Sequence, residues 1–292
     1  MYIKCIVYIG LLVMTSMIPR AKKSLMLTHN LYNSKKVLVT GGATGIGLTL
    51  AQSYAKLGAN VLICSRNEER LQAASRTHPN INYHVLDVRD LNGVSDFAEQ
   101  MYKDDTLPDV VVNNAAGNFV CLTENLSQNA WNSIMDIVLK GTFAITHEIG
   151  KRMILTTKPG VFLNISTTYA ETGSSYVVPS SLSKAACNNL TKSLASEWSK
   201  YGMRFNSISL GPIYTDGAFS RLDPDGTFQE QGIQNLCIKR MGEKEEVANL
   251  ATYLTSDYAS WMTGNIINLD GGETIWKSGE FNHIDMSSLA KL

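Results

Sequence analysis

The stretch KVLVTGGATGIG at residues 36–47 holds the strongest fold signal in this chain. Its apolar first half predicts a buried strand, and an amphipathic helix pattern follows at residues 45–57. Glycine lets the backbone turn tightly and approach a pyrophosphate, which then sits at the positive end of the following helix. The stretch therefore predicts a dinucleotide loop, with a ligand-free glycine turn as the alternative. The loop comprises Thr40, Gly41, Gly42, Ala43, Thr44, Gly45, Ile46 and Gly47.

Beyond this stretch, short apolar runs alternate with longer amphipathic segments. The expected strands are 36–40, 60–64, 82–86, 109–113, 160–166, 204–209 and 265–269. The expected helices are 45–57, 67–75, 92–103, 127–154, 180–200 and 243–255. Such alternation is typical of an α/β protein whose helices flank a parallel sheet. We expect a doubly wound Rossmann fold: a seven-stranded, mainly parallel sheet with helices on both faces and a ligand crevice at the carboxyl ends of the strands.

The composition fits a globular enzyme and excludes some other classes of protein. Lys plus Arg number 26 and Asp plus Glu number 26, so no overall field would attract nucleic acid. Residues 5–18 are almost wholly apolar but too few to span a bilayer, so we expect no stable membrane insertion. The five cysteines and five histidines are scattered without ligand spacing. We expect reduced thiols and no structural metal.

The two ends of the chain suggest different cellular addresses. Residues 1–35 form a basic leader without acidic residues, which resembles a transit peptide for the mitochondrial matrix, or is simply a frayed extension. Ala290-Lys291-Leu292 is close to the Ser-Lys-Leu peroxisomal signal. Between these ends we expect one Rossmann-fold domain at 36–276, with a mobile substrate lid at about 214–240, followed by a tail at 277–292.

The ends of the second and third strands suggest which cofactor is bound. Ser65 and Arg66 follow the second strand, where an acidic residue would favour NAD. A guanidinium beside a hydroxyl suits a 2′-phosphate and favours NADPH, unless Arg66 is only a solvated charge at a helix start. Asp87 follows the third strand and is placed to bind the adenine amino group; capping the next helix is its alternative role.

The expected catalytic pair of such folds is altered here. Lys184 lies on a predicted helix, but the residue four positions earlier is Ser180 instead of tyrosine. An alkyl hydroxyl is too weak an acid to replace a phenol, whose pKa is about 10. Tyr32 and Lys36 are the one pair with the usual spacing, and they precede the fold's first strand, away from the crevice.

These features together resemble the short-chain dehydrogenase/reductase family over residues 36–275, and within it the mitochondrial-type 2,4-dienoyl-CoA reductases over residues 36–282. The strings that carry the closer resemblance are 114–119 (NAAGNF), 168–173 (TYAETG), 217–224 (GAFSRLDP) and 278–282 (SGEFN). Residues Thr167 and Val138 depart from the serine and asparagine of the parent family, and Leu210 from its usual proline.

The resemblance implies a role for individual residues. Tyr169 and Asn118 would donate hydrogen bonds to the oxygen that becomes negative during reduction. Lys184 would hold the nicotinamide ribose, and Ser180 would join the same cluster. Because Tyr169 lies two residues after Thr167, we expect both side chains to point the same way from the end of one strand. Packing for Tyr169, turn formation for Asn118 and a solvated charge for Lys184 are the structural alternatives.

Further residues would bind cofactor and substrate. By the same resemblance, the cofactor would also contact Asn114, Leu210, Gly211, Pro212 and Ile213. The coenzyme A part of a fatty acyl-CoA would contact Arg89, Phe119, Ser127 and Arg221. Ordinary alternatives exist for these four: surface charge for the arginines, core packing for Phe119 and helix capping for Ser127.

The resemblance thus implies NADPH-dependent reduction of 2,4-dienoyl-CoA to 3-enoyl-CoA in the β-oxidation of unsaturated fatty acids. The alternatives are a trans-2-enoyl-CoA or carbonyl reductase on the same scaffold, or a nucleotide-binding scaffold without catalysis. Helices 127–154 and 180–200 are more apolar than one sheet face requires. With the resemblance, this suggests a homotetramer.

Overall fold

A parallel sheet of seven strands forms the centre of the molecule in the computed structural model, which describes residues 30–215 and 232–276. The strand order is β3-β2-β1-β4-β5-β6-β7 and every pairing is parallel. The strands are β1 (Lys36–Thr40), β2 (Asn60–Ser65), β3 (Ile81–Val85), β4 (Val110–Asn113), β5 (Gly160–Thr167), β6 (Met203–Leu210) and β7 (Ile266–Leu269). The fold class predicted from the sequence is confirmed.

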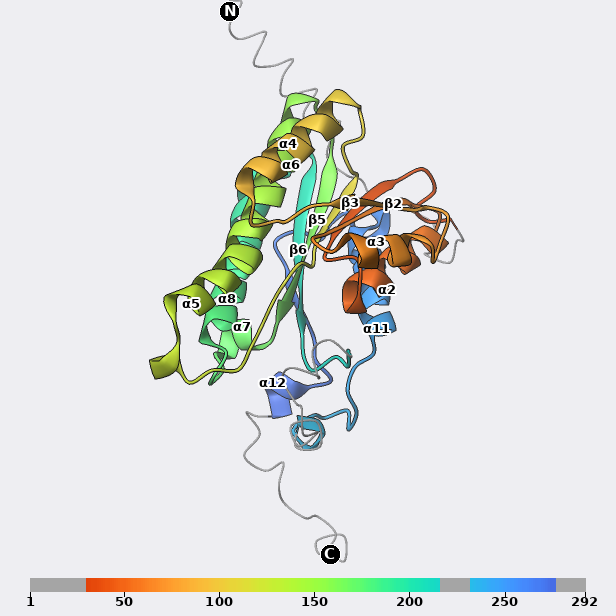
Figure 1. The fold of residues 1–292 in the computed structure, drawn as a ribbon. Helices are drawn as coiled ribbons and strands as arrows, with labels where there is room; N and C mark the ends of the chain where they lie inside the picture. The colour runs from red at the N-terminus through yellow and green to blue at the C-terminus, as the bar shows by residue number, and fades with distance from the viewer. Residues whose placement is uncertain (1–29, 216–231, 277–292) are drawn as a thin grey trace, which may run out of the picture.

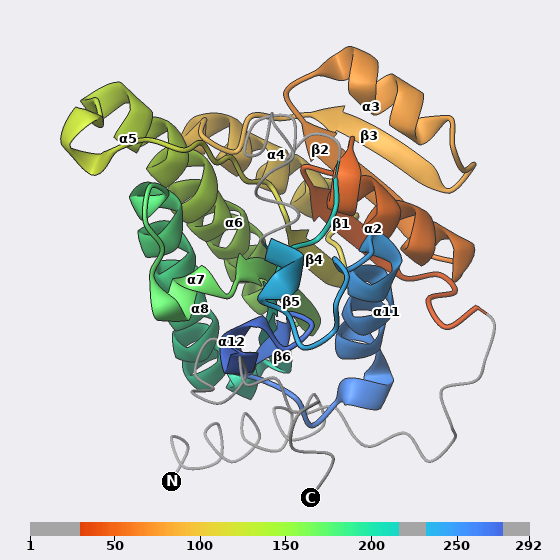
Figure 2. The same cartoon turned by 90° about the horizontal axis from the view of Figure 1, so that it is seen from below.

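Helices cover both faces of this sheet and make a three-layer molecule (Figures 1 and 2). One face carries α2 (Gly45–Lys56), α3 (Glu68–Ser75) and α11 (Lys244–Thr255). The other carries α4 (Leu91–Lys103), α6 (Gly141–Leu155) and α8 (Val178–Trp198). Each face buries its own apolar cluster, and residues of β1 contribute to both because successive side chains of a strand point to opposite faces.

The predicted helix at 127–154 is interrupted by a π-helical turn. The segment consists of α5 (Gln128–Met135), the turn η2 (Asp136–Lys140) and α6. Ser127 caps α5, because its hydroxyl accepts a hydrogen bond of 3.2 Å from the Ala130 amide. Periodicity alone did not predict the π turn, since apolar residues continue through it.

Short elements follow several strands at the carboxyl edge of the sheet. They are η1 (Thr123–Asn125) after β4, α7 (Tyr169–Thr172) after β5 and α12 (Glu273–Trp276) after β7. Elsewhere η3 (Ser199–Tyr201) ends α8 and η4 (Asp257–Ala259) follows α11. Figure 1 shows α7, α12 and the beginning of α8 gathered at the same end of the molecule.

The segment before β1 packs against the domain. Tyr32 is only 2% exposed, and its hydroxyl contacts Thr255 at 2.6 Å, while its ring meets Tyr54 edge to face. The packed unit therefore extends N-terminal of Lys36. Lys36 itself bonds through its side chain to the Asp105 carbonyl at 2.6 Å. Tyr32 and Lys36 thus serve packing and do not form a catalytic pair.

Candidate active site

The glycine loop lies where the chain order of the strands reverses, between β1 and β4. Gly41 has φ of 65°, a region that side chains disfavour. Gly47 has no room for a side chain, because an added Cβ would lie 2.3 Å from the Gly41 carbonyl oxygen. The loop is therefore shaped closely by its glycines, and ligands of open α/β sheets bind at such a reversal point.

Hydrogen bonds from the end of β4 fix this loop. Asn114 Nδ2 donates to the carbonyls of Thr40 at 3.0 Å and Gly41 at 3.2 Å. The Thr40 hydroxyl accepts from the backbone amides of Asn114 and Ala115, at 3.0 and 3.1 Å. Asn114 thus supports the loop's backbone, a structural task that the sequence did not reveal.

The end of β2 offers an unpaired hydroxyl and a solvent-facing guanidinium. Ser65 Oγ is buried without a hydrogen-bond partner in the described part of the chain. Arg66 beside it is exposed, and Asn67, not Arg66, caps α3 through the Arg70 amide. A buried polar atom without a partner is costly, and a ligand oxygen would satisfy it. This pair therefore fits a phosphate group at the end of β2.

Asp87 and Arg89 form a close pair after β3. Three hydrogen bonds join the guanidinium to the carboxylate, the shortest 2.6 Å. These bonds hold the pKa of Asp87 below its usual value. The alternative that Asp87 caps the next helix is wrong, because Asp90 caps α4 through the Gly93 amide. Arg89, predicted to bind coenzyme A, is engaged by Asp87 here.

The segment after β6 is tightly packed beside β7. Gly211 N donates to the Leu269 carbonyl, and a Cβ on Gly211 would come 2.7 Å from Asp270 Cα. The Pro212 carbonyl accepts from Gly242, and Ile213 forms a β-bridge with that glycine. The predicted cofactor-contact segment 210–213 therefore has a fixed backbone at the crevice edge.

Three polar side chains from distant segments meet at the carboxyl ends of β4 and β5. Asn118 Nδ2 lies 3.2 Å from the Tyr169 hydroxyl. That hydroxyl lies 3.1 Å from Ser180 Oγ, in the first turn of α8. The structure therefore brings together the predicted tyrosine, asparagine and serine.

The prediction that Tyr169 extends the pleat of β5 is wrong. The strand ends at Thr167, and Thr168 already has helical dihedral angles of φ −57° and ψ −37°. Tyr169 is the first residue of α7 and reaches Asn118 from there. Ser181, which no sequence pattern marks, holds this turn because its hydroxyl donates to the Tyr169 carbonyl at 2.8 Å.

Lys184 lies one helical turn after Ser180 and is buried, at 8% exposure. Its ammonium donates a hydrogen bond to the Ile165 carbonyl of β5. Burial lowers its pKa, and the nearby Cys187 opposes that shift. A buried ammonium has three donors, so the described contacts leave donors for a ligand.

This arrangement can stabilise negative charge on a bound oxygen atom. The Asn118 amide donates to the phenol oxygen, so the phenol can donate its own hydrogen either to Ser180 Oγ or to a bound ligand. A preorganised donor acts strongly where water is excluded. The cluster can therefore supply a donor to an oxyanion, and Lys184 adds a buried amine one turn along α8 from Ser180.

The four predicted coenzyme A contacts are not brought together by the described residues. Phe119 packs against the buried cluster of Ile134, Val138 and Cys187. Ser127 is an exposed helix cap, and Arg89 is paired with Asp87. Arg221, like most of the predicted lid, lies outside the described residues.

The described residues show neither a metal-ligand cluster nor a membrane-spanning helix. Residues 30–215 and 232–276 contain no group of three or more His, Cys, Asp or Glu that could hold a metal ion. No helix within the same ranges has the length and hydropathy needed to cross a membrane.

Known proteins resemble this chain over most of its length. Residues 41–274 match the family described as Enoyl-(Acyl carrier protein) reductase. A probable 2,4-dienoyl-CoA reductase of Caenorhabditis elegans, described as (3E)-enoyl-CoA-producing, is 43% identical over 270 residues, which cover 90% of this chain and 86% of that protein.

Solved structures agree with the fold. A short-chain dehydrogenase from Bacillus anthracis is 38% identical with a TM-score of 0.75, covering 82% of this chain and 96% of that one. A gluconate 5-dehydrogenase from Burkholderia cenocepacia, in complex with NADP and tartrate, is 26% identical with a TM-score of 0.79, covering 84% and 98%.

The fold, the glycine loop and these relatives define an oxidoreductase that uses a nicotinamide cofactor. More particularly, the chain belongs to the short-chain dehydrogenase/reductase family, and its relatives include proteins named as 2,4-dienoyl-CoA reductases.

Proposed function

We propose that this protein reduces 2,4-dienoyl-CoA to 3-enoyl-CoA with NADPH, in the β-oxidation of unsaturated fatty acids. The observation that carries the proposal is the meeting of Tyr169 with Asn118 and Ser180. Ser180 stands where carbonyl-reducing relatives carry their tyrosine, so the phenol comes from another direction. The relative named as a dienoyl-CoA reductase supports the same reaction.

The proposed roles follow from the charge that the reaction creates. When bound, NADPH would supply a hydride to the far end of the conjugated dienoyl thioester, which would leave negative charge on the thioester oxygen. Tyr169 and Asn118 donate hydrogen bonds to that oxygen, and one such donor contributes roughly 3 to 4 kcal/mol. A proton from Tyr169 or from water, added at carbon, completes the 3-enoyl product, so no alkoxide is formed. Lys184 holds the nicotinamide ribose.

Replacing Tyr169 with Phe tests this role directly. Loss of the phenol hydroxyl is expected to lower kcat by about 100- to 1,000-fold while NADPH still binds. The assay follows NADPH absorbance with hexadienoyl-CoA, and fluorescence titration follows NADPH binding. Tyr176→Phe is a matched control, because Tyr176 is exposed on the loop before α8. A Tyr169→Phe enzyme that keeps most of its rate would remove Tyr169 from the mechanism.

The preference for NADPH is proposed from Ser65 and Arg66. The unpaired Ser65 hydroxyl and the neighbouring guanidinium suit a 2′-phosphate. Arg66→Asp is expected to weaken NADPH binding by about 100-fold and NADH binding only a few-fold, because repulsion acts on the phosphate alone. Arg70→Asp on the exposed side of α3 is the matched control. Equal weakening of both cofactors would contradict the assignment.

A trans-2-enoyl-CoA reductase is the second candidate, because the matching family is described as an enoyl reductase. Comparison of hexadienoyl-CoA with crotonyl-CoA and a simple ketone separates the candidates. Faster reduction of crotonyl-CoA would replace the first proposal with the second. Coenzyme A roles for Arg89, Phe119, Ser127 and Arg221 remain part of the proposal, and for Arg89 they require its pair with Asp87 to open.

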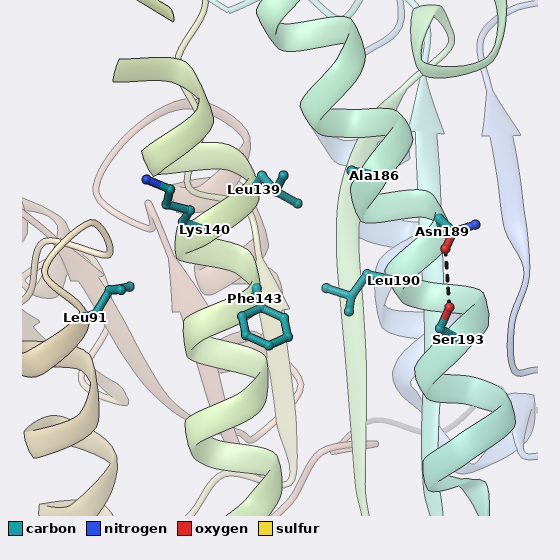
Figure 3. Close-up of a pocket in the computed structure, with 8 residues that line it drawn as sticks. All are labelled: Leu91, Leu139, Lys140, Phe143, Ala186, Asn189, Leu190 and Ser193. Atoms are coloured by element: carbon teal, nitrogen blue, oxygen red, sulfur yellow. Dashed lines mark hydrogen bonds between the residues drawn. The ribbon is translucent and has the colours of Figure 1, made fainter. Parts of the chain in front are cut away.

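We also propose that the enzyme assembles as a homotetramer. A hollow of about 400 Å³ lies between α4, α6 and α8, lined largely by apolar groups. Figure 3 shows Phe143 and Leu190 pointing toward this hollow from facing helices, and Phe143 is 49% exposed. Burial of such groups between subunits favours association. Light scattering of the wild type and of Phe143→Glu measures the assembly state, with a monomeric wild type as the contrary result.

The mitochondrial matrix is the proposed compartment, with the peroxisome as the alternative address. Both signals lie outside the described residues, in the leader and at Ala290-Lys291-Leu292. Microscopy of a tagged copy with either terminus masked separates them.

A further inference from the structure

A hydrogen bond links the residue before Tyr169 to the last described helix of the chain. Thr168 Oγ1 donates to Glu273 Oε2 at 2.8 Å, across 105 positions of sequence. Thr168 is buried at 6% exposure. Glu273 begins α12, which lies at the same end of the sheet as α7 (Figures 1 and 2).

The Thr168 side chain is free for this contact because it does not cap its own helix. Thr168 occupies the N-cap position of α7, yet its hydroxyl makes no capping bond there. Its backbone amide donates to the Leu210 carbonyl at 3.0 Å, which ties the same residue to the end of β6. Thr168 is therefore fixed by β6 through its backbone and by α12 through its side chain.

Glu273 is presented by a turn that is itself well fixed. The Asp270 carboxylate accepts from the backbone amides of Gly272 and Thr274, both at 3.0 Å, and from the Thr274 hydroxyl at 2.7 Å. The Glu273 amide donates to the Asp270 carbonyl at 3.0 Å. The carboxylate that meets Thr168 thus comes from a closed, capped turn at the end of β7.

We propose that Glu273 is a positioning residue for Tyr169. Its carboxylate holds Thr168 by a charge-assisted bond and so sets where α7 begins and where the phenol meets Asn118 and Ser180. Bonds to ionised groups are shorter and stronger than neutral ones, and small misplacements of reacting groups lower rates steeply. This inference rests on the proposed role of Tyr169.

Two complementary pairs of variants test the proposal. Glu273→Met and Thr168→Val each remove one partner at nearly constant volume, and each is expected to lower kcat by roughly tenfold. KM and the affinity for NADPH should change little, because Tyr169 acts on the oxyanion. Glu273→Gln and Thr168→Ser keep an acceptor and a donor and should restore most of the rate.

The double variant and a neighbouring control separate positioning from general damage. Combining Glu273→Met with Thr168→Val should cost clearly less than the sum of the two single losses, since both changes remove the same shared bond. Thr172→Val is the control, because Thr172 lies in the same short helix and its exposed hydroxyl bonds only locally, to the Gly173 carbonyl. It should keep wild-type kcat. Additive losses in the double variant would overturn the proposal.

Hydrogen–deuterium exchange gives a readout that needs no substrate. The amides of residues 169–173 should exchange faster in Glu273→Met and Thr168→Val than in the wild type or Thr172→Val. Unchanged exchange in Glu273→Met and Thr168→Val would overturn the proposal. If Tyr169→Phe lowers kcat, faster exchange in these two variants without a fall in their own kcat would overturn it as well. If the wild type does not reduce dienoyl-CoA, the proposed function is wrong. The exchange measurement alone then tests whether the Thr168–Glu273 hydrogen bond holds α7 in place.

Discussion

Two buried cations on the same side of the sheet have different kinds of partners. Arg152 on α6 is 6% exposed and bonds to Glu148 at 2.6 Å and Glu99 at 3.0 Å. Lys184 on α8 is 8% exposed, and the described residues give it one hydrogen bond, to the Ile165 carbonyl. One cation is paired with carboxylates, and the other is left with a single neutral partner.

The difference is consistent with a structural role for Arg152 and with the ligand-binding role proposed for Lys184. A buried charge is costly unless it is paired, so Arg152 belongs to the packing of α6 on α4. Burial disfavours the charged form of Lys184 and lowers its pKa. Under the proposed function, the partner that compensates this buried amine is the bound cofactor. Removing each cation should therefore affect different properties.

The largest effect is expected for the stability of Arg152→Met. Removal of one partner of a buried pair should lower the free energy of unfolding by about 3 kcal/mol, because Glu148 and Glu99 lose their shared cation. Urea unfolding measures it, and the specific activity of the folded enzyme should stay unchanged. Lys103→Met is the control, since Lys103 meets Glu99 at 3.6 Å on the surface. If Arg152→Met and Lys103→Met lose equally little free energy of unfolding, Arg152 is not a structural buried charge and its contrast with Lys184 fails.

The next largest effect is expected for the activity of Lys184→Met. The variant should lose about 100-fold in kcat/KM, chiefly through weaker NADPH binding, because hydrogen bonds to a charged group contribute about 1.5 to 3 kcal/mol. Its melting temperature should be unchanged or higher, since no buried ammonium remains to be desolvated. Lys192→Met on the exposed side of α8 is the control. Marked destabilisation without loss of activity would show that Lys184 is structural too.

The sequence predicts the sheet well because strand formation leaves a local signal. Each expected strand matches an observed one with bounds shifted by no more than one residue, since apolar runs between polar turns coincide with buried backbone. The glycine loop is equally local, because Gly41 and Gly47 are required by backbone shape alone.

The sequence singled out Tyr169, Asn118 and Ser180, which the structure brings together, but it did not predict the geometry that joins them. The position of Tyr169 depends on Thr168 turning into α7, and that turn is stabilised by Leu210 and Glu273, far away in sequence. No periodicity reports such contacts. The ion pair between Asp87 and Arg89 is local, because the residues are two positions apart. It was still not predicted, because the loop conformation that brings them together has no recognisable sequence pattern.

The smallest expected effect is a loss of folding stability at low pH. It tests the ion pair between Arg152 and Glu148. Burial alone would raise the pKa of Glu148, but hydrogen bonds from Lys151 and Arg152 outweigh it and hold the pKa at about 2. A carboxyl with a depressed pKa stabilises the fold above its unfolded pKa of about 4.3, and this contribution is lost as the pH falls toward 2. The wild type should lose about 1 kcal/mol more than Glu148→Gln between pH 5 and pH 3, measured by urea unfolding.

Salt provides the control for this last prediction. Glu246 also has a pKa lowered to about 2, chiefly by its hydrogen bond from Arg240, but that pair is exposed on the surface. The screening length is about 8 Å at physiological ionic strength and shortens as salt is added, and salt weakens exposed ion pairs more than buried ones. The acid sensitivity removed by Glu148→Gln should therefore persist in added salt, whereas that removed by Glu246→Gln should shrink. If salt reduces both acid sensitivities equally, Glu148 behaves as a surface charge. Arg152 would then not be a buried, paired cation that contrasts with Lys184.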